Sequence, residues 1–162
     1  MYHENLSRRV CVRDAGQIPE VLLTNPYQLP AADLAYLGDA VYEIEVRTFL
    51  VKNGVKTPSV ASLAYVKATA QSAAMEKILP HLTEAENDVY RRGRNCIHNV
   101  TPKSCTPSEY RRATGLEALF GYLWLMGDTD RIHALCRIGI GIGDAADTDS
   151  TPPCADDTES GV

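Results

Sequence analysis

Two carboxylates stand in apolar surroundings in this sequence. Asp39 lies in the run LAYLGDAVYEIEV, and Glu117 is the only charged residue between Leu116 and Met126. Both runs show the apolar spacing of a helix, and a helix that is apolar on nearly all sides is expected to be buried. An uncompensated buried carboxylate is costly or takes up a proton. We therefore expect both acids to have partners: an arginine, a backbone cap or a cation.

Small residues surround both acids. Gly38 precedes Asp39, and Gly115 and Gly121 lie within about one turn of Glu117. Glycine inside a helix costs about 1 kcal/mol relative to alanine, so each of these glycines needs a packing reason. Small residues let two helices approach closely, which would bring one acid from each helix to the same point. Facing carboxylates in a helical core can hold a divalent cation, and oxygen ligands alone select Mg²⁺ or Mn²⁺ over zinc.

A structural role for the two acids is the alternative. Glu117 could pair with Arg47 or Arg112, and Asp39 could accept a hydrogen bond from a neighbouring tyrosine hydroxyl. The residue pattern alone leaves both alternatives open. Glu43, one turn after Asp39, could be a third acid of the site. We favour an ion pair with Arg47, because a glutamate four residues before a base is the better orientation on a helix.

Helices are the elements that must position these acids. The chain of 162 residues is 44% hydrophobic but only 7% aromatic, and no strand pattern of any length occurs, so the predicted fold class is all-α. Thr83 and Glu86 form a capping box, Ser108 is expected to cap the apolar helix that carries Glu117, and Asp128 to begin the last helix. The expected helices span about residues 31–52, 58–79, 84–93, 108–126 and 128–140.

The chain divides into three parts by composition. Residues 1–29 contain two of the nine prolines, Pro19 and Pro26, and form an N-terminal extension, and residues 30–143, which begin with Pro30, form the helical domain. Residues 144–162 hold six acids and no lysine or arginine, and we expect them to be a disordered acidic tail.

Positive charge is concentrated near the middle of the chain, although the formal net charge is −5. Between residues 91 and 112, Glu109 is the only acid. Such a basic stretch keeps a nucleic-acid partner possible, whereas a solvated surface is the simpler alternative. The basic residues of this stretch are Arg91, Arg92, Arg94, Lys103, Arg111 and Arg112.

The cysteines and the hydropathy favour a reduced, cytoplasmic protein with no membrane partner. The five cysteines are an odd number at irregular spacing, and no secretory signal or long apolar run is visible. Cys96, His98 and Cys105 match no common zinc-ligand spacing, so we discount a zinc site.

Two motifs resemble a known family. Residues 34–41, with the run YLGD, resemble the signature helix of the ribonuclease III catalytic domain, and residues 116–121, LEALFG, resemble the second acidic helix of that family. The RRGR run at 91–94, with Asn95, Thr101-Pro102-Lys103 and Tyr110-Arg111, is similar to Mini-III, the compact branch that lacks a separate domain for binding double-stranded RNA. The resemblance covers about residues 30–140.

The resemblance implies a function and a site. It implies a helical endonuclease that forms a homodimer and cleaves double-stranded RNA with Mg²⁺, for which Mn²⁺ can substitute. The implied substrate is the paired stems at the ends of precursor 23S ribosomal RNA. Asp39 and Glu117 match the catalytic and metal-binding acids of the family. The basic residues between 91 and 112 would contact RNA by its shape and phosphates, with little sequence preference.

The chain also departs from the family pattern. Full-length ribonuclease III carries further acids where this chain has Ala35 and Thr114, so the number of metal ions held at once stays open. The competing hypotheses are a non-catalytic RNA-binding dimer and a metal-binding structural protein. Retention of both acids argues against the first, and the basic stretch argues against the second. The apolar surface that includes Tyr36 and Leu37 is the expected dimer interface.

Overall fold

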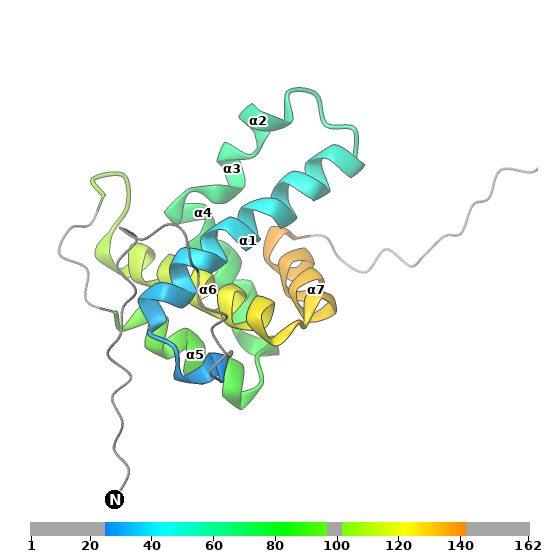
Figure 1. Ribbon diagram of the computed structural model, residues 1–162. Helices are drawn as coiled ribbons and strands as arrows, with labels where there is room; N and C mark the ends of the chain where they lie inside the picture. Colours follow the sequence, from blue (N-terminus) through cyan, green and yellow to red (C-terminus); the bar gives the residue numbers. More distant parts are fainter. Residues whose placement is uncertain (1–24, 97–101, 142–162) are drawn as a thin grey trace, which may run out of the picture.

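The computed structural model describes residues 25–96 and 102–141 of the chain (Figure 1). Within these two ranges all regular structure is helical, and no strand occurs there, which confirms the predicted all-α class. The elements in chain order are η1 (Pro26–Gln28), α1 (Ala31–Lys52), α2 (Pro58–Ala61), α3 (Leu63–Val66), α4 (Ala68–Ile78), η2 (Leu79–His81), α5 (Glu84–Arg94), α6 (Pro107–Met126) and α7 (Thr129–Ile140).

The helices α1 and α6 cross at the centre of the molecule through two glycines. A Cβ atom added to Gly38 of α1 would lie 1.7 Å from the carbonyl oxygen of Glu117, and one added to Gly121 of α6 would lie 2.0 Å from the carbonyl oxygen of Leu34. Any larger residue would collide with backbone at both positions. The close approach predicted from the small residues is therefore confirmed.

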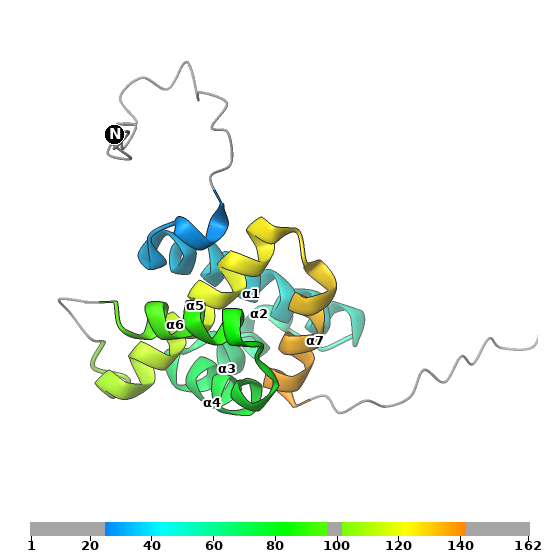
Figure 2. The ribbon, with the colours of Figure 1, turned by 90° about the horizontal axis from the view of Figure 1, so that it is seen from below.

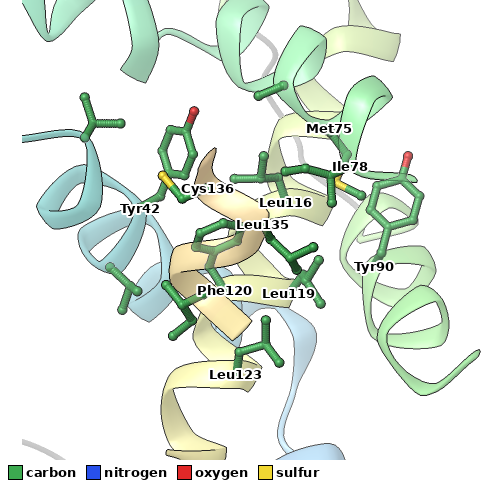
Figure 3. Close-up of a cluster of buried hydrophobic side chains, with 14 of the residues drawn as sticks. Tyr42, Met75, Ile78, Tyr90, Leu116, Leu119, Phe120, Leu123, Leu135 and Cys136 are labelled. Atoms are coloured by element: carbon green, nitrogen blue, oxygen red, sulfur yellow. The ribbon is translucent and has the colours of Figure 1, made fainter. Parts of the chain in front are cut away.

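The core lies around α6, with α1, α4 and α7 packed against it (Figures 1 and 3). It is mostly aliphatic, and its aromatic members include Tyr42 and Phe120, whose rings meet edge to face with their centroids 5.4 Å apart. Figure 2 shows α5 on another side of α6, where Val89 and Ala118 belong to a second, smaller cluster.

The prediction of one continuous helix over residues 58–79 is wrong. The structure breaks this stretch into α2, α3 and α4, and Lys67 between the last two has extended backbone angles (φ −68°, ψ 147°). No glycine or proline marks this break in the sequence. The Ser62 hydroxyl donates to the carbonyl oxygen of Ser59 at 2.9 Å, a local bond that competes with continuous helix. The break creates a new first turn for α4, and α4 packs against α6.

The helix caps agree with the sequence at two places and differ at one. Thr83 and Glu86 form the predicted capping box at α5, and the Asp128 side chain accepts from the backbone N–H of Arg131 at the start of α7. The predicted cap of α6 at Ser108 is wrong. Thr106 caps this helix in a capping box with Glu109, because Pro107 takes the first helical position, where its missing N–H costs nothing.

The segment before α1 is tied to α5. Arg92 donates to the carbonyl oxygens of Tyr27 and Leu29, both at 2.6 Å, and its guanidinium lies 5.1 Å from the centre of the Tyr27 ring. The Tyr27 hydroxyl donates to Asp88 at 2.5 Å. Residues 25–29, which the sequence assigned to the N-terminal extension, therefore pack against the helical domain.

Residues 1–24, residues 97–101 between α5 and α6, and residues 142–162, which include the predicted acidic tail, lie outside the described residues. None of the described helices is long and apolar enough to cross a membrane.

Candidate active site

Asp39 and Glu117 flank the point where α1 and α6 cross. Asp39 directly follows Gly38, the glycine that lies against the backbone of Glu117. The negative charge of Asp39 is the second cause, after burial, that raises the pKa of the Glu117 carboxyl. The structure thus brings the two predicted acids to one place, as the small residues indicated.

The expectation that both acids are buried is wrong. Asp39 is exposed, and Glu117 is half-buried. The reason is that α1 has apolar residues on two faces and only one of them contacts the core. On its outer face the apolar side chains of Tyr36 and Ile44 are 87% and 55% exposed. An apolar composition all round this helix therefore does not bury its acid.

Burial and repulsion both act on Glu117. Burial is the larger cause and the charge of Asp39 the second, and together they raise the pKa of Glu117 to about 8. A hydrogen bond from the Gln71 side chain acts in the opposite direction. Without a bound cation, burial and the charge of Asp39 therefore both favour the protonated form of Glu117.

The arginines considered as structural partners bind other groups. Arg47 pairs with Glu43 at 2.6 Å, which confirms the predicted i,i+4 ion pair. Arg112 pairs with Glu76 at 2.9 Å. Among the described residues, no ion pair links Glu117 or Asp39 to a basic side chain. The structural alternative for Glu117 thus loses the two arginine partners that the sequence offered it.

The pair of acids suits a divalent cation with oxygen ligands. Two neighbouring carboxylates repel each other, and in residues 25–96 and 102–141 no protein cation compensates them. Carboxylates are preferred ligands of Mg²⁺, which keeps several waters and commonly takes only one or two protein carboxylates. In the same part of the chain no three or more His, Cys, Asp or Glu side chains gather as a larger metal site. Asp39 and Glu117 are thus the side chains that could hold the cation.

The six basic residues fall into two groups. Arg91, Arg94, Lys103 and Arg111 are exposed. Arg92 and Arg112 already bind protein groups: Arg92 holds the segment before α1, and Arg112 donates to Ser72 at 2.9 Å in addition to its pair with Glu76. The basic stretch therefore combines a solvated surface with two structural contacts.

Gln71 is a site residue that the sequence reasoning missed. It lies in the first turn of α4, is only 2% exposed, and donates from its side chain to Glu117. Its spacing carried a signal: Gln71 is one turn before Met75, and Ile78 follows on the same buried face. A polar side chain at a core-facing helix position needs a polar partner. The sequence alone assigned no role to this position.

Comparison with known proteins identifies the family. The profile of the family described as "Ribonuclease III domain" matches residues 32–128, which include both acids. The chain belongs to the ribonuclease III domain family, as the two acidic motifs indicated.

Comparison with individual relatives indicates the branch of this family to which the chain belongs. The chain is 50% identical over 118 residues to the Mini-ribonuclease 3 of Symbiobacterium thermophilum, covering 71% of this chain and 91% of that protein. It is 43% identical over 110 residues to the Mini-ribonuclease 3 of a Thermoanaerobacter species, covering 66% and 78%. A crystal structure of a Fusobacterium nucleatum protein, 34% identical, matches with a TM-score of 0.63 over 70% of this chain and 93% of the other. These matches assign the chain to the Mini-ribonuclease 3 branch.

Proposed function

We propose that this chain, a double-strand-specific endoribonuclease by its family, cleaves RNA with a Mg²⁺ ion held by Asp39 and Glu117. One observation carries the proposal: the glycine contact at the crossing of α1 and α6 brings Asp39 and Glu117 together, and no basic side chain of the described residues forms an ion pair with either. If Glu117, the less exposed of the two acids, had only a structural role, we would expect it to have a basic partner. Mn²⁺, which also prefers oxygen ligands, is expected to substitute.

The residues of this chain prepare the site for that chemistry. A bound divalent cation supplies positive charge for the phosphate oxygens and lowers the pKa of an attacking water. Exposed Asp39 leaves one side of the site open to a phosphodiester backbone. Half-buried Glu117 provides a second carboxylate, and its surroundings disfavour the negative charge unless a cation compensates it.

We propose that the exposed bases Arg91, Arg94, Lys103 and Arg111 bind the RNA. Their charged ends are free of the protein contacts that hold Arg92 and Arg112. Side chains cannot read the deep major groove of A-form RNA, so recognition should depend on phosphates, 2′-hydroxyls and helix shape. For the substrate we propose the paired stems at the ends of precursor 23S ribosomal RNA, on the basis of the resemblance to Mini-III enzymes.

We propose a homodimer formed through the outer face of α1. Tyr36 and Ile44 expose large apolar side chains there, and Leu37 between them is half-buried. A two-fold pair of sites can cut both strands of one duplex, whereas a single site cuts one strand. Light scattering at micromolar concentration should give twice the mass of the chain, and a fully active monomer would refute the dimer.

A cleavage assay tests the proposed activity. Long duplex RNA is incubated with the protein in Mg²⁺, in Mn²⁺ and in EDTA, with Asp39→Asn as the matched variant. Discrete cuts that need the metal and disappear in the variant support the proposal. Binding without cleavage would favour a non-catalytic RNA-binding dimer, and neither binding nor cleavage would favour a metal-binding structural protein.

A further inference from the structure

The helix α4 presents two adjacent polar side chains to α6. Gln71 and Ser72 are each 2% exposed, although they lie in a helix whose other buried residues, Ala74, Met75 and Ile78, belong to the core. Buried polar groups are costly unless they have partners. Both side chains have partners on α6, but one partner is an acid and the other is a base.

Gln71 contacts the acid of α6, and Ser72 contacts the base. In the described part of the chain no buried side-chain nitrogen or oxygen lacks a hydrogen-bond partner, and the partner of the buried Gln71 amide is Glu117. The Ser72 hydroxyl accepts from Nε of Arg112 at 2.9 Å. Glu76, one turn further along α4, pairs with the same guanidinium at 2.9 Å. Arg112 is therefore bound by Ser72 and Glu76, and a neutral amide is the group that contacts Glu117.

The neutrality of this contact matters for a cation site. An arginine or lysine at position 71 would orient Glu117 and also compensate its negative charge, which is the charge that a divalent cation needs. An amide orients the carboxylate through a hydrogen bond but brings no net charge. Partners of this kind, one shell away from a metal, fix the orientation of the ligand.

We propose that Gln71 is a positioning residue, whose side-chain amide orients the Glu117 carboxylate for a divalent cation without neutralising it. The proposal rests on the proposed function for the cation, but the contact itself can be tested without metal. The break at Lys67 is part of the arrangement, because it makes Gln71 a first-turn residue of a separate helix that packs against α6.

Two substitutions of similar length test the proposal. Gln71→Met keeps the volume but removes the donor, and Gln71→Lys keeps a donor but adds positive charge. In EDTA, an NMR titration of the Glu117 carboxyl should show a higher pKa in the methionine variant and a lower pKa in the lysine variant than in the wild type. Titration calorimetry with Mg²⁺ should show affinity lower by about 10- to 100-fold in both variants. Duplex binding in EDTA should not change in the methionine variant.

Ser62→Ala is the matched control, since it removes another buried side-chain hydrogen bond, 2.9 Å long, at the start of α3. It should leave the pKa of Glu117 and the Mg²⁺ affinity at wild-type values. If the methionine variant does not fold, Gln71→Asn replaces it, because it retracts the amide by one methylene and should act in the same direction. Opposite pKa changes combined with a shared loss of Mg²⁺ affinity support the proposal, since a role in packing alone would not produce them.

Two results would overturn the proposal: a methionine variant that keeps the wild-type pKa and Mg²⁺ affinity, or a lysine variant that binds Mg²⁺ as tightly as the wild type. A wild-type protein that neither binds Mg²⁺ nor cleaves duplex RNA would instead refute the proposed function. In that case the pKa changes in EDTA would still decide whether Gln71 positions Glu117.

Discussion

Replacing Glu117 by glutamine should stabilise the metal-free protein while it abolishes cleavage. The pKa of Glu117 in the folded chain is about 8, compared with 4.5 for an unperturbed glutamate. Because the folded pKa is the higher one, ionisation is disfavoured by folding, and stability falls as the pH rises between these two values. Glu117→Gln cannot ionise, so in EDTA it should melt like the wild type below about pH 4.5 and at a higher temperature above about pH 8.

The size of the effect follows from the pKa. Each pKa unit corresponds to about 1.4 kcal/mol, so the rise from 4.5 to about 8 sets an upper limit of about 5 kcal/mol. Water reaches the half-buried side chain, and screening of this kind reduces the effect, so we expect about 1–3 kcal/mol. For a chain of this size that is an increase in Tm of roughly 3–10 °C.

Thermal melts from pH 4 to pH 9 in EDTA, with and without added Mg²⁺, measure this effect. Glu43→Gln is the control, because it removes an acid one turn from Asp39 that is already paired with Arg47. The control should not gain stability at high pH. Mg²⁺ should raise the Tm of the wild type but not that of Glu117→Gln. The reasoning is refuted if Glu117→Gln and the wild type melt alike across the whole pH range, or if the variant cleaves duplex RNA at the wild-type rate.

Three other predictions concern the surroundings of the site. Gly38→Ala should destabilise the protein by about 3 kcal/mol in a chemical denaturation and reduce cleavage, since its Cβ would collide with the backbone of Glu117. Arg92→Ala should cost about 2 kcal/mol because two backbone carbonyls lose a charged donor, whereas Arg91→Ala should weaken duplex binding without lowering the Tm. Burial opposes ionisation of Glu86, but hydrogen bonds from Arg131 and Thr83 lower its pKa overall. The stabilisation that ionised Glu86 gives the folded state is therefore present above the usual glutamate pKa and is lost on acidification. Glu86→Gln should flatten the acid side of the curve of stability against pH.

Much of the fold could be predicted because local signals mark the ends of its helices. The extent of α1 follows from its apolar spacing and from the asparagine–glycine pair after Lys52, and that of α5 from its capping box. The break at Lys67 could not be predicted, because no residue type there opposes a helix. The break is explained by the packing of Gln71 against α6, which is a property of the tertiary structure.

The site was predictable in its members but not in its environment. The residue types and the glycines identified Asp39 and Glu117 and their proximity. Their exposure was mispredicted, since the sequence does not reveal that one apolar face of α1 is left exposed by the other described helices. The contacts of Arg92 with residues 25–29 were also out of reach, because they join segments more than 60 positions apart and involve backbone carbonyls that have no sequence signature.

The glycine contact at the crossing of α1 and α6 makes the geometry of the site independent of which side chains fill the core. The spacing of the two acids is set where backbone meets backbone, at Gly38 and Gly121, and not where side chains interlock. Substitutions of core residues such as Met75 or Leu119 can therefore change the thermal tolerance of the protein while the distance between the carboxylates stays the same. Stability could be redesigned in this scaffold independently of the reaction, provided that the two glycines are kept.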